Sequence, residues 1–228
     1  MRKLIFSMLI LPALCAVRFE AEAASVSVGA ATWYSDWYFK QEKQKPVDSA
    51  LMYGPLFSMS FGDRWSWSNI LLYGKFTLHD PQQKMILSRT DIDSTLNYAV
   101  NGWFKVFAGG KWMAYDESWF KHRGGGPAAG VGLTVPLAKQ VFLLGNASGV
   151  LIFGRQRNDF SADRKVSYME PGVNTTLSLA YAAETVPVSL SIGARCQYFR
   201  TIYDSSPDEE DTHHLFYGVT LSAMYTFR

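Results

Sequence analysis

The chain has 228 residues, with 22 Lys and Arg against 20 Asp and Glu, and a formal net charge of +2 at pH 7. A charge so close to balance gives no support for nucleic-acid binding. Hydrophobic residues make up 48% of the chain, yet mean hydropathy is near zero. Beyond the N-terminal segment no apolar run reaches about 18 residues, which excludes membrane-spanning helices there.

Residues 1–23 have the composition of an export signal. A positively charged start is followed by an apolar stretch at 4–17 and by a small-x-small cleavage sequence, Ala-Glu-Ala, at 21–23. The apolar stretch is shorter than the roughly 20 residues that a membrane-spanning helix needs. The sequence therefore predicts a cleaved signal peptide, with residues 24–228 forming one exported domain.

Ten strand-like runs follow in the exported domain. In most of them apolar residues alternate with small or polar ones, the period-2 pattern of a strand with lipid on one side and a lumen on the other. The run at 140–153 alternates poorly, and eight strands is the alternative count if one hairpin is misread. The predicted strands are 26–38, 50–61, 66–78, 91–101, 103–115, 128–137, 140–153, 166–182, 187–200 and 214–227.

The connections between these runs alternate between short and long. Asn-Gly at 101–102 is a strong signal for a tight hairpin, and three other connections are similarly short. Short turns at one end and longer loops at the other are the layout of bacterial outer-membrane barrels. With five long and four short connections between ten strands, both termini are expected at the short-turn end, which faces the periplasm in such barrels. The long connections are 40–48, 79–90, 116–127, 154–165 and 201–213.

Charged residues within the strands identify the lumen face. A charge on the lipid face at mid-membrane costs about 2–4 kcal/mol, so we expect these side chains to point inward. Charges of both signs that need partners or water form either a salt-bridged plug or the lining of a narrow pore, and both interpretations stay open. The candidate lumen residues are Lys75, Asp93, Lys105, Lys111, Glu170 and Arg195.

The last predicted strand resembles the assembly signal of the Gram-negative outer-membrane β-barrel proteins. The residues that carry the resemblance are Gly218, Leu221, Ala223, Tyr225 and Phe227. The chain departs from the family in having one arginine after its final aromatic residue. The resemblance implies an all-β, transmembrane, antiparallel up-and-down barrel in the outer membrane of a Gram-negative bacterium. The implied partners are outer-membrane lipid, lipopolysaccharide and the barrel assembly machinery, with small solutes as possible ligands.

Outer-membrane barrels include proteases and lipid A-modifying enzymes, so catalytic residues need consideration. All four histidines lie in or beside long connections: His79, His122, His213 and His214. No histidine is therefore expected on the barrel wall, where a Ser–His hydrolase would need one. A rim enzyme is the alternative, with His79 and Asp80 at one strand end and Asp211 and His213 at another, as in ten-stranded outer-membrane proteases.

Three charged or glycine-rich segments have simpler interpretations. The acidic run at 208–211 lacks metal-ligand spacing, so we predict a solvated loop without metal or cofactor. The three glycines at 124–126 do not lead from a strand into a helix, so we interpret them as a flexible loop rather than a phosphate cradle. The loop at 154–165 is either a solubilising segment or a contact for lipopolysaccharide phosphates, which arginine suits. Its candidate contact residues are Arg155, Arg157, Arg164 and Lys165.

The sequence thus favours a non-enzymatic outer-membrane barrel without cofactor. Within that class it does not separate a structural or surface-interaction barrel from a narrow small-solute pore. A rim-site protease or a lipid A-modifying hydrolase is the alternative function.

Overall fold

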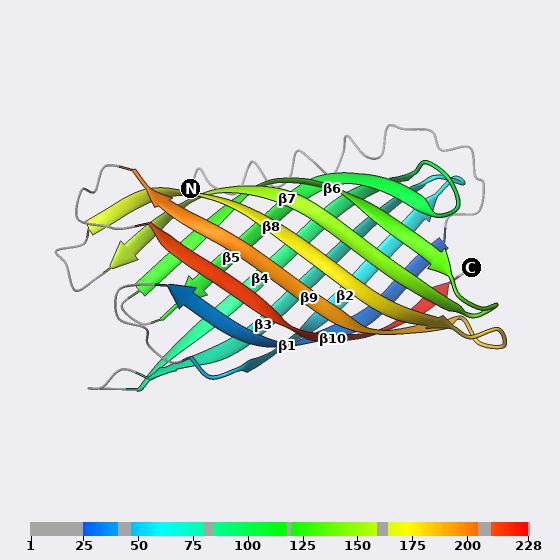
Figure 1. Ribbon diagram of the computed structural model, residues 1–228, viewed down its shortest axis with the longest axis horizontal. Helices are drawn as coiled ribbons and strands as arrows, with labels where there is room; N and C mark the ends of the chain where they lie inside the picture. Colours follow the sequence, from blue (N-terminus) through cyan, green and yellow to red (C-terminus); the bar gives the residue numbers. More distant parts are fainter. Residues whose placement is uncertain are drawn as a thin grey trace, which may run out of the picture.

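A computed structural model shows ten antiparallel strands that close into one barrel, in the order β1-β10-β9-β8-β7-β6-β5-β4-β3-β2 (Figure 1). The structure describes residues 25–40, 47–79, 84–117, 120–158, 164–204 and 211–227, so the predicted signal peptide lies outside it. The strands are β1 (Ser25–Lys40), β2 (Ala50–Phe61), β3 (Trp65–His79), β4 (Lys84–Ala99), β5 (Phe104–Asp116), β6 (Phe120–Pro136), β7 (Val141–Asn158), β8 (Arg164–Ala182), β9 (Val188–Tyr203) and β10 (Thr212–Phe227). The prediction of ten strands is confirmed, and the count of eight is excluded. Among the described residues there is no helix long and apolar enough to cross a bilayer.

Three strands extend well beyond their predicted bounds, all at the end of the barrel with the long connections. β4 begins at Lys84, β6 begins at Phe120, and β7 continues to Asn158. In these extensions polar residues occupy both faces, so the apolar–polar alternation that reveals a half-buried strand is absent. Backbone pairing with neighbouring strands continues nevertheless.

The interpretation of the three glycines at 124–126 as a loop is wrong, because all three lie within β6. A β-carbon on Gly124 would collide with the Tyr168 hydroxyl, and one on Gly126 would collide with the carbonyl of Leu151 on the next strand. Glycine is therefore required here for close approach rather than for flexibility.

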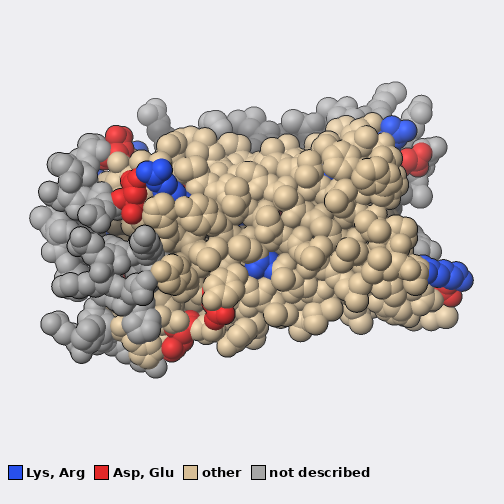
Figure 2. Space-filling model, viewed as in Figure 1, with Lys and Arg blue, Asp and Glu red and all other residues tan. Residues whose placement is uncertain are grey.

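The outer wall is apolar along its middle. Figure 2 shows one side of the barrel, where charged side chains gather toward the two ends and the middle is almost free of them. Exposed aromatic residues lie near both ends, as expected at the two interfaces of a bilayer. At the short-turn end they are Trp65, Trp103, Tyr181, Tyr225 and Phe227, and toward the other end they include Tyr34, Tyr38, Tyr53, Tyr198 and Tyr217.

β1 is aromatic on both faces. Trp33 and Trp37 are buried inside the barrel, whereas Tyr34 and Tyr38 are exposed outside. β1 closes the barrel by pairing with β10, from Val26 opposite Phe227 along fifteen residue pairs. The described ends of the chain therefore lie together at the short-turn end.

Candidate functional site

Five charged side chains from three strands form a cluster in the middle of the barrel, which we call the central cluster: Arg89, Asp91, Asp93, Lys111 and Arg195. Arg89 donates two hydrogen bonds to Asp91, from Nε and from Nη2, each 2.8 Å long. Lys111 Nζ lies 2.9 Å from Asp93 and 3.4 Å from Asp91, and Arg195 Nη2 lies 2.7 Å from Asp93. Arg89 is fully buried, and all but Asp93 are at most 5% exposed. Charges so buried need partners, and this geometry supplies them.

The central cluster spans the lumen from one wall to the other. β4 and β9 lie opposite each other in the ring, with four strands between them on either side. Two hydrogen bonds nevertheless join them directly: Arg89 Nη2 donates to Gln197 Oε1 at 2.6 Å, and Arg195 Nη2 donates to Asp93 Oδ2 at 2.7 Å. The interior is therefore filled at this level by side chains of opposite walls.

Aromatic rings fill the next level, toward the long-connection end. The Arg89 guanidinium lies 3.6 Å from the centroid of the Phe216 ring. Phe216 stacks on Trp37 with centroids 5.1 Å apart, and Trp37 stacks on Tyr115 at 5.5 Å. Tyr115 and His214 belong to opposite strands of the ring, yet their rings are only 6.4 Å apart. Cation–ring and ring–ring contacts thus extend the blockage of the lumen.

A second buried polar group lies in this half of the barrel, around His122. Its Nε2 is 3.0 Å from Glu170 Oε1 and its Nδ1 is 3.1 Å from Gln156 Oε1, while Thr201 donates to the same Glu170 oxygen at 2.6 Å. Tyr168 stacks on the imidazole with ring centroids 3.9 Å apart. Both imidazole nitrogens contact other groups, so neither is available to activate a nucleophile.

The expectation that no histidine lies on the barrel wall is wrong for His122, which is 4% exposed within β6. It was missed because the adjacent glycines resemble a loop. Arg89 was missed because the predicted strand began at residue 91, and Asp91, the first residue of that strand, was not assigned to the lumen, although Arg89, Asp91 and Asp93 share one face at period 2. That alternation of charges was the signal available in the sequence.

The candidate lumen residues do not all come together. Asp93, Lys111 and Arg195 meet in the central cluster, while Glu170 belongs to the His122 group. Lys75 departs from the prediction, because it is exposed between the buried residues Gly74 and Phe76 and so lies on the outer face of β3. It lies toward the long-connection end of β3, where a lysine ammonium can reach the polar interface.

The half of the lumen nearer the short turns contains a cavity of about 230 Å³. Polar side chains line most of it, and Asp93 and Arg195 of the central cluster form its inner end. Lys105 also lines it. The other polar lining side chains are Ser68, Thr95, Asn97, Asn146, Ser148, Asn174 and Thr176.

Basic side chains gather on the outer face of β6, β7 and β8 at the long-connection end. We call them the rim patch: Lys121, Arg123, Arg155, Arg157 and Lys165. The pairs Arg123–Arg155, Lys121–Arg157 and Arg157–Lys165 are directly opposite each other on neighbouring strands. Three of the four predicted lipopolysaccharide-contact residues are thus brought together. The side chain of the fourth, Arg164, lies outside the described part of the structure.

The described residues of the proposed rim enzyme each contact a different group. His79 Nε2 lies 2.9 Å from Asp48 at the end of β3, whereas His213 lies on β10 and contacts the Tyr198 hydroxyl at 2.6 Å. Asp211 receives hydrogen bonds from the Arg200 guanidinium. Asp80 and the acidic residues 208–210 lie outside the described residues. Within the described part of the chain, no three His, Cys, Asp or Glu side chains are grouped so as to hold a metal ion.

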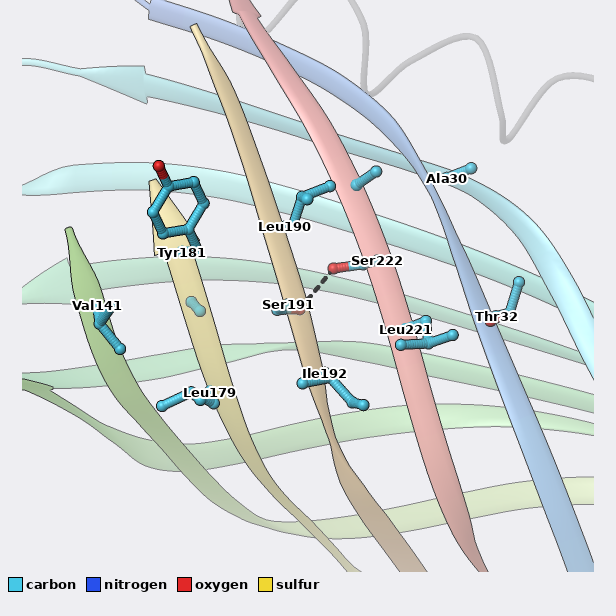
Figure 3. Close-up of a pocket in the computed structure, with 12 residues that line it drawn as sticks. Ala30, Thr32, Val141, Leu179, Tyr181, Leu190, Ser191, Ile192, Leu221 and Ser222 are labelled. Atoms are coloured by element: carbon cyan, nitrogen blue, oxygen red, sulfur yellow. Dashed lines mark hydrogen bonds between the residues drawn. The ribbon is translucent and has the colours of Figure 1, made fainter. Parts of the chain in front are cut away.

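A hollow with a volume of about 550 Å³ lies on the outer wall, over β8, β9, β10 and β1 (Figure 3). Leu179, Leu190, Ile192 and Leu221 line it. Ser191 and Ser222 also border it, and they are hydrogen-bonded to each other at 2.7 Å. Such an apolar surface suits the hydrocarbon chains of lipid.

Similar solved structures share this architecture at very low sequence identity. The outer-membrane protease OmpT of Escherichia coli is 8% identical, with a TM-score of 0.57 over 92% of this chain and 98% of that chain. The β domain of the Bordetella autotransporter BrkA is 10% identical, with a TM-score of 0.50 over 91% of this chain and 100% of that one. At such identities the likeness establishes the fold alone. No protein-family model matches the chain, and no curated protein matches it by sequence.

Proposed function

We propose that this chain, which has the fold of the outer-membrane β-barrel proteins, is a closed, non-enzymatic barrel of the Gram-negative outer membrane that acts through its surface. The short-turn end, with both described chain ends, faces the periplasm, as the layout of turns and loops in such barrels predicts. The long-connection end, with the rim patch, then faces outward.

The observation that carries the closed lumen is the pair of hydrogen bonds between opposite strands, from Arg89 to Gln197 and from Arg195 to Asp93. A pore requires a continuous water-filled path. Here the central cluster and the aromatic rings beyond it occupy two successive levels of the interior. A ten-stranded barrel is narrow enough for side chains to fill it in this way.

Single-channel recording of refolded, heat-modifiable protein in planar bilayers tests the closed lumen. We expect no discrete conductance steps, because ions would have to displace fully buried charge pairs. Steps whose ion selectivity shifts in the Lys105→Glu variant would overturn the proposal and identify a narrow pore instead.

The rim patch is the surface through which such a barrel would act. Like charges placed directly opposite on neighbouring strands are destabilising, so their accumulation favours an anionic ligand that offsets the repulsion. Asp116 contacts Arg123 through two hydrogen bonds of 2.8 Å and so offsets only part of the charge. Lipopolysaccharide presents phosphates at this height, and guanidinium groups bind phosphate in bidentate fashion.

Binding of refolded protein to lipopolysaccharide, with and without its phosphate groups, tests this assignment. The double variant Arg155→Gln, Lys165→Gln is expected to bind the phosphorylated form about tenfold or more weakly, since hydrogen bonds to charged groups contribute about 1.5–3 kcal/mol. Lys139→Gln removes an 85% exposed lysine at the opposite end of the barrel and serves as the matched control. Equal losses in both variants, or binding that does not depend on the phosphates, would contradict a specific rim patch.

A further inference from the structure

We propose that the cavity in the short-turn half of the lumen binds a small, proton-carrying oxyanion such as hydrogen phosphate, between Lys105 and Arg195. The cavity is closed at its inner end by the central cluster, so it is a binding site with one entrance rather than part of a channel. It lies inside the barrel, remote from the outward-facing rim patch, and does not depend on it.

The charge balance around the cavity favours an anion. The central cluster contains three cations, Arg89, Lys111 and Arg195, against two carboxylates, Asp91 and Asp93. Glu170, the other buried carboxylate, is held by His122 and Thr201 and not by this cluster. An excess positive charge in a buried site is costly without a counter-charge.

Lys105 adds a further positive charge to the cavity. Among the described residues its ammonium has no carboxylate partner, and it lies 5.9 Å from the centroid of the Phe107 ring. Its stem passes over Gly132, where a β-carbon would collide with Lys105 and lie 2.6 Å from Asn146 Oδ1. The absence of a side chain at Gly132 therefore leaves the space in which Lys105 extends beside the cavity.

Arg195 and Asn174 supply unused hydrogen-bonding groups at the same cavity. Arg195 is 5% exposed and binds Asp93 through Nη2, while its buried Nε has no hydrogen-bond partner among the described residues. The buried Asn174 Oδ1 is likewise unpaired within the described part of the chain. Both residues line the cavity, and an oxyanion that also carries a proton can accept from an N–H and donate to an amide oxygen, as buried polar groups require. Both oxygens of Asp93 are already occupied by Lys111 and Arg195.

The dimensions agree with a small ligand. The cavity volume of about 230 Å³ is several times the roughly 30 Å³ that one water molecule occupies in the liquid. A phosphate ion and a few waters fit this space.

Isothermal titration of the refolded full chain in nonionic detergent with sodium phosphate tests the site. Lys105→Gln is expected to weaken binding about tenfold to a hundredfold, because it removes one charge-assisted hydrogen bond. Lys75→Gln, which changes a lysine on the outer wall, is expected to leave this binding unchanged. Gly132→Ala keeps every charge but displaces Lys105, so it should also weaken binding.

The assignment would be overturned by the absence of saturable phosphate binding to folded protein, or by equal loss of binding in the Lys105→Gln and Lys75→Gln variants. Sodium sulfate at the same ionic strength provides a further comparison, because at neutral pH sulfate carries no proton. Equal affinity for sulfate would refute the role given to Asn174. Loss of binding in Arg155→Gln alone would assign the phosphate to the rim patch and refute the cavity site.

Discussion

Arg89 and Arg123 make the same contact in opposite surroundings. Each guanidinium donates two hydrogen bonds of 2.8 Å to one aspartate, Asp91 for Arg89 and Asp116 for Arg123. The Arg89 pair is at most 1% exposed, whereas the Arg123 side chain is 53% exposed. Identical geometry with different burial allows the effect of desolvation to be measured directly.

Arg89→Ala is expected to lower the free energy of unfolding by about 3–5 kcal/mol, because it leaves Asp91 buried with Lys111 as its remaining cation. Arg123→Ala should cost about 1 kcal/mol or less, because water replaces the lost partner of Asp116. Urea unfolding followed by tryptophan fluorescence measures both variants. Similar losses in the two would show that burial does not decide the strength of these pairs.

The sequence identified part of this residue-level picture. Asp93, Lys111 and Arg195 were found because each interrupts an apolar alternation, which is the physical mark of an inward position. Lys75 was assigned to the same face although it lies outside, since near the interface an outward lysine carries little cost. Which charges pair across the lumen depends on strand tilt and ring closure, and neither is encoded in local periodicity.

At the scale of the element, glycines on β6 and β7 make room for the Tyr168 ring. A β-carbon on Gly154 would collide with this ring and with the carbonyl of Arg123. The Tyr168 ring stacks on His122. The spacing between β7 and β8 and the geometry of the His122 group therefore depend on the lack of a side chain at Gly154. From sequence these glycines resembled loop residues because their neighbours in space were unknown.

Gly154→Ala is expected to reduce the free energy of unfolding by about 1–3 kcal/mol through overpacking. Gly149→Ala, on the same strand, is the control, because a β-carbon there has no atom within 4 Å and its effect should stay within about 0.5 kcal/mol. The same urea titration applies. A harmless Gly154→Ala would show that Tyr168 can move without cost.

At the scale of the whole molecule, the barrel has an apolar exterior and a charged interior. Val219 on β10 and Val186 in a short turn are almost equally exposed, at 50% and 51%. Only Val219 lies in the middle of the wall, where the fold places lipid. The two positions therefore differ not in exposed fraction but in what surrounds them: lipid at Val219 and water at Val186.

Val219→Arg is expected to destabilise the barrel in phospholipid vesicles by about 2–4 kcal/mol, the cost of an arginine near the bilayer midplane. Val186→Arg should have little effect, because the turn remains in water. Reversible unfolding from vesicles gives both values. Equal stabilities would contradict the placement of the bilayer around the middle of the wall.

The period-2 pattern and the alternation of short and long connections predicted the ten-strand barrel. They failed where β4, β6 and β7 extend toward the long-connection end, because polar side chains there lie on the buried inner face as well as on the outer face, so apolar and polar residues do not alternate. Closure between β1 and β10 was expected from the class of fold and not from any local feature of those residues.

Because β1 pairs with β10, the ring cannot close until the last strand is in place, and an open sheet of these strands has two unpaired edges. The lumen contacts are equally late: the bonds of Arg89 and Asp93 to β9 connect residues 108 and 102 positions apart in the chain. In an open sheet these charges lack their partners on the opposite wall and are exposed to water. Their dehydration coincides with ring closure, so the step that removes the edges is also the step that forms the buried ion pairs.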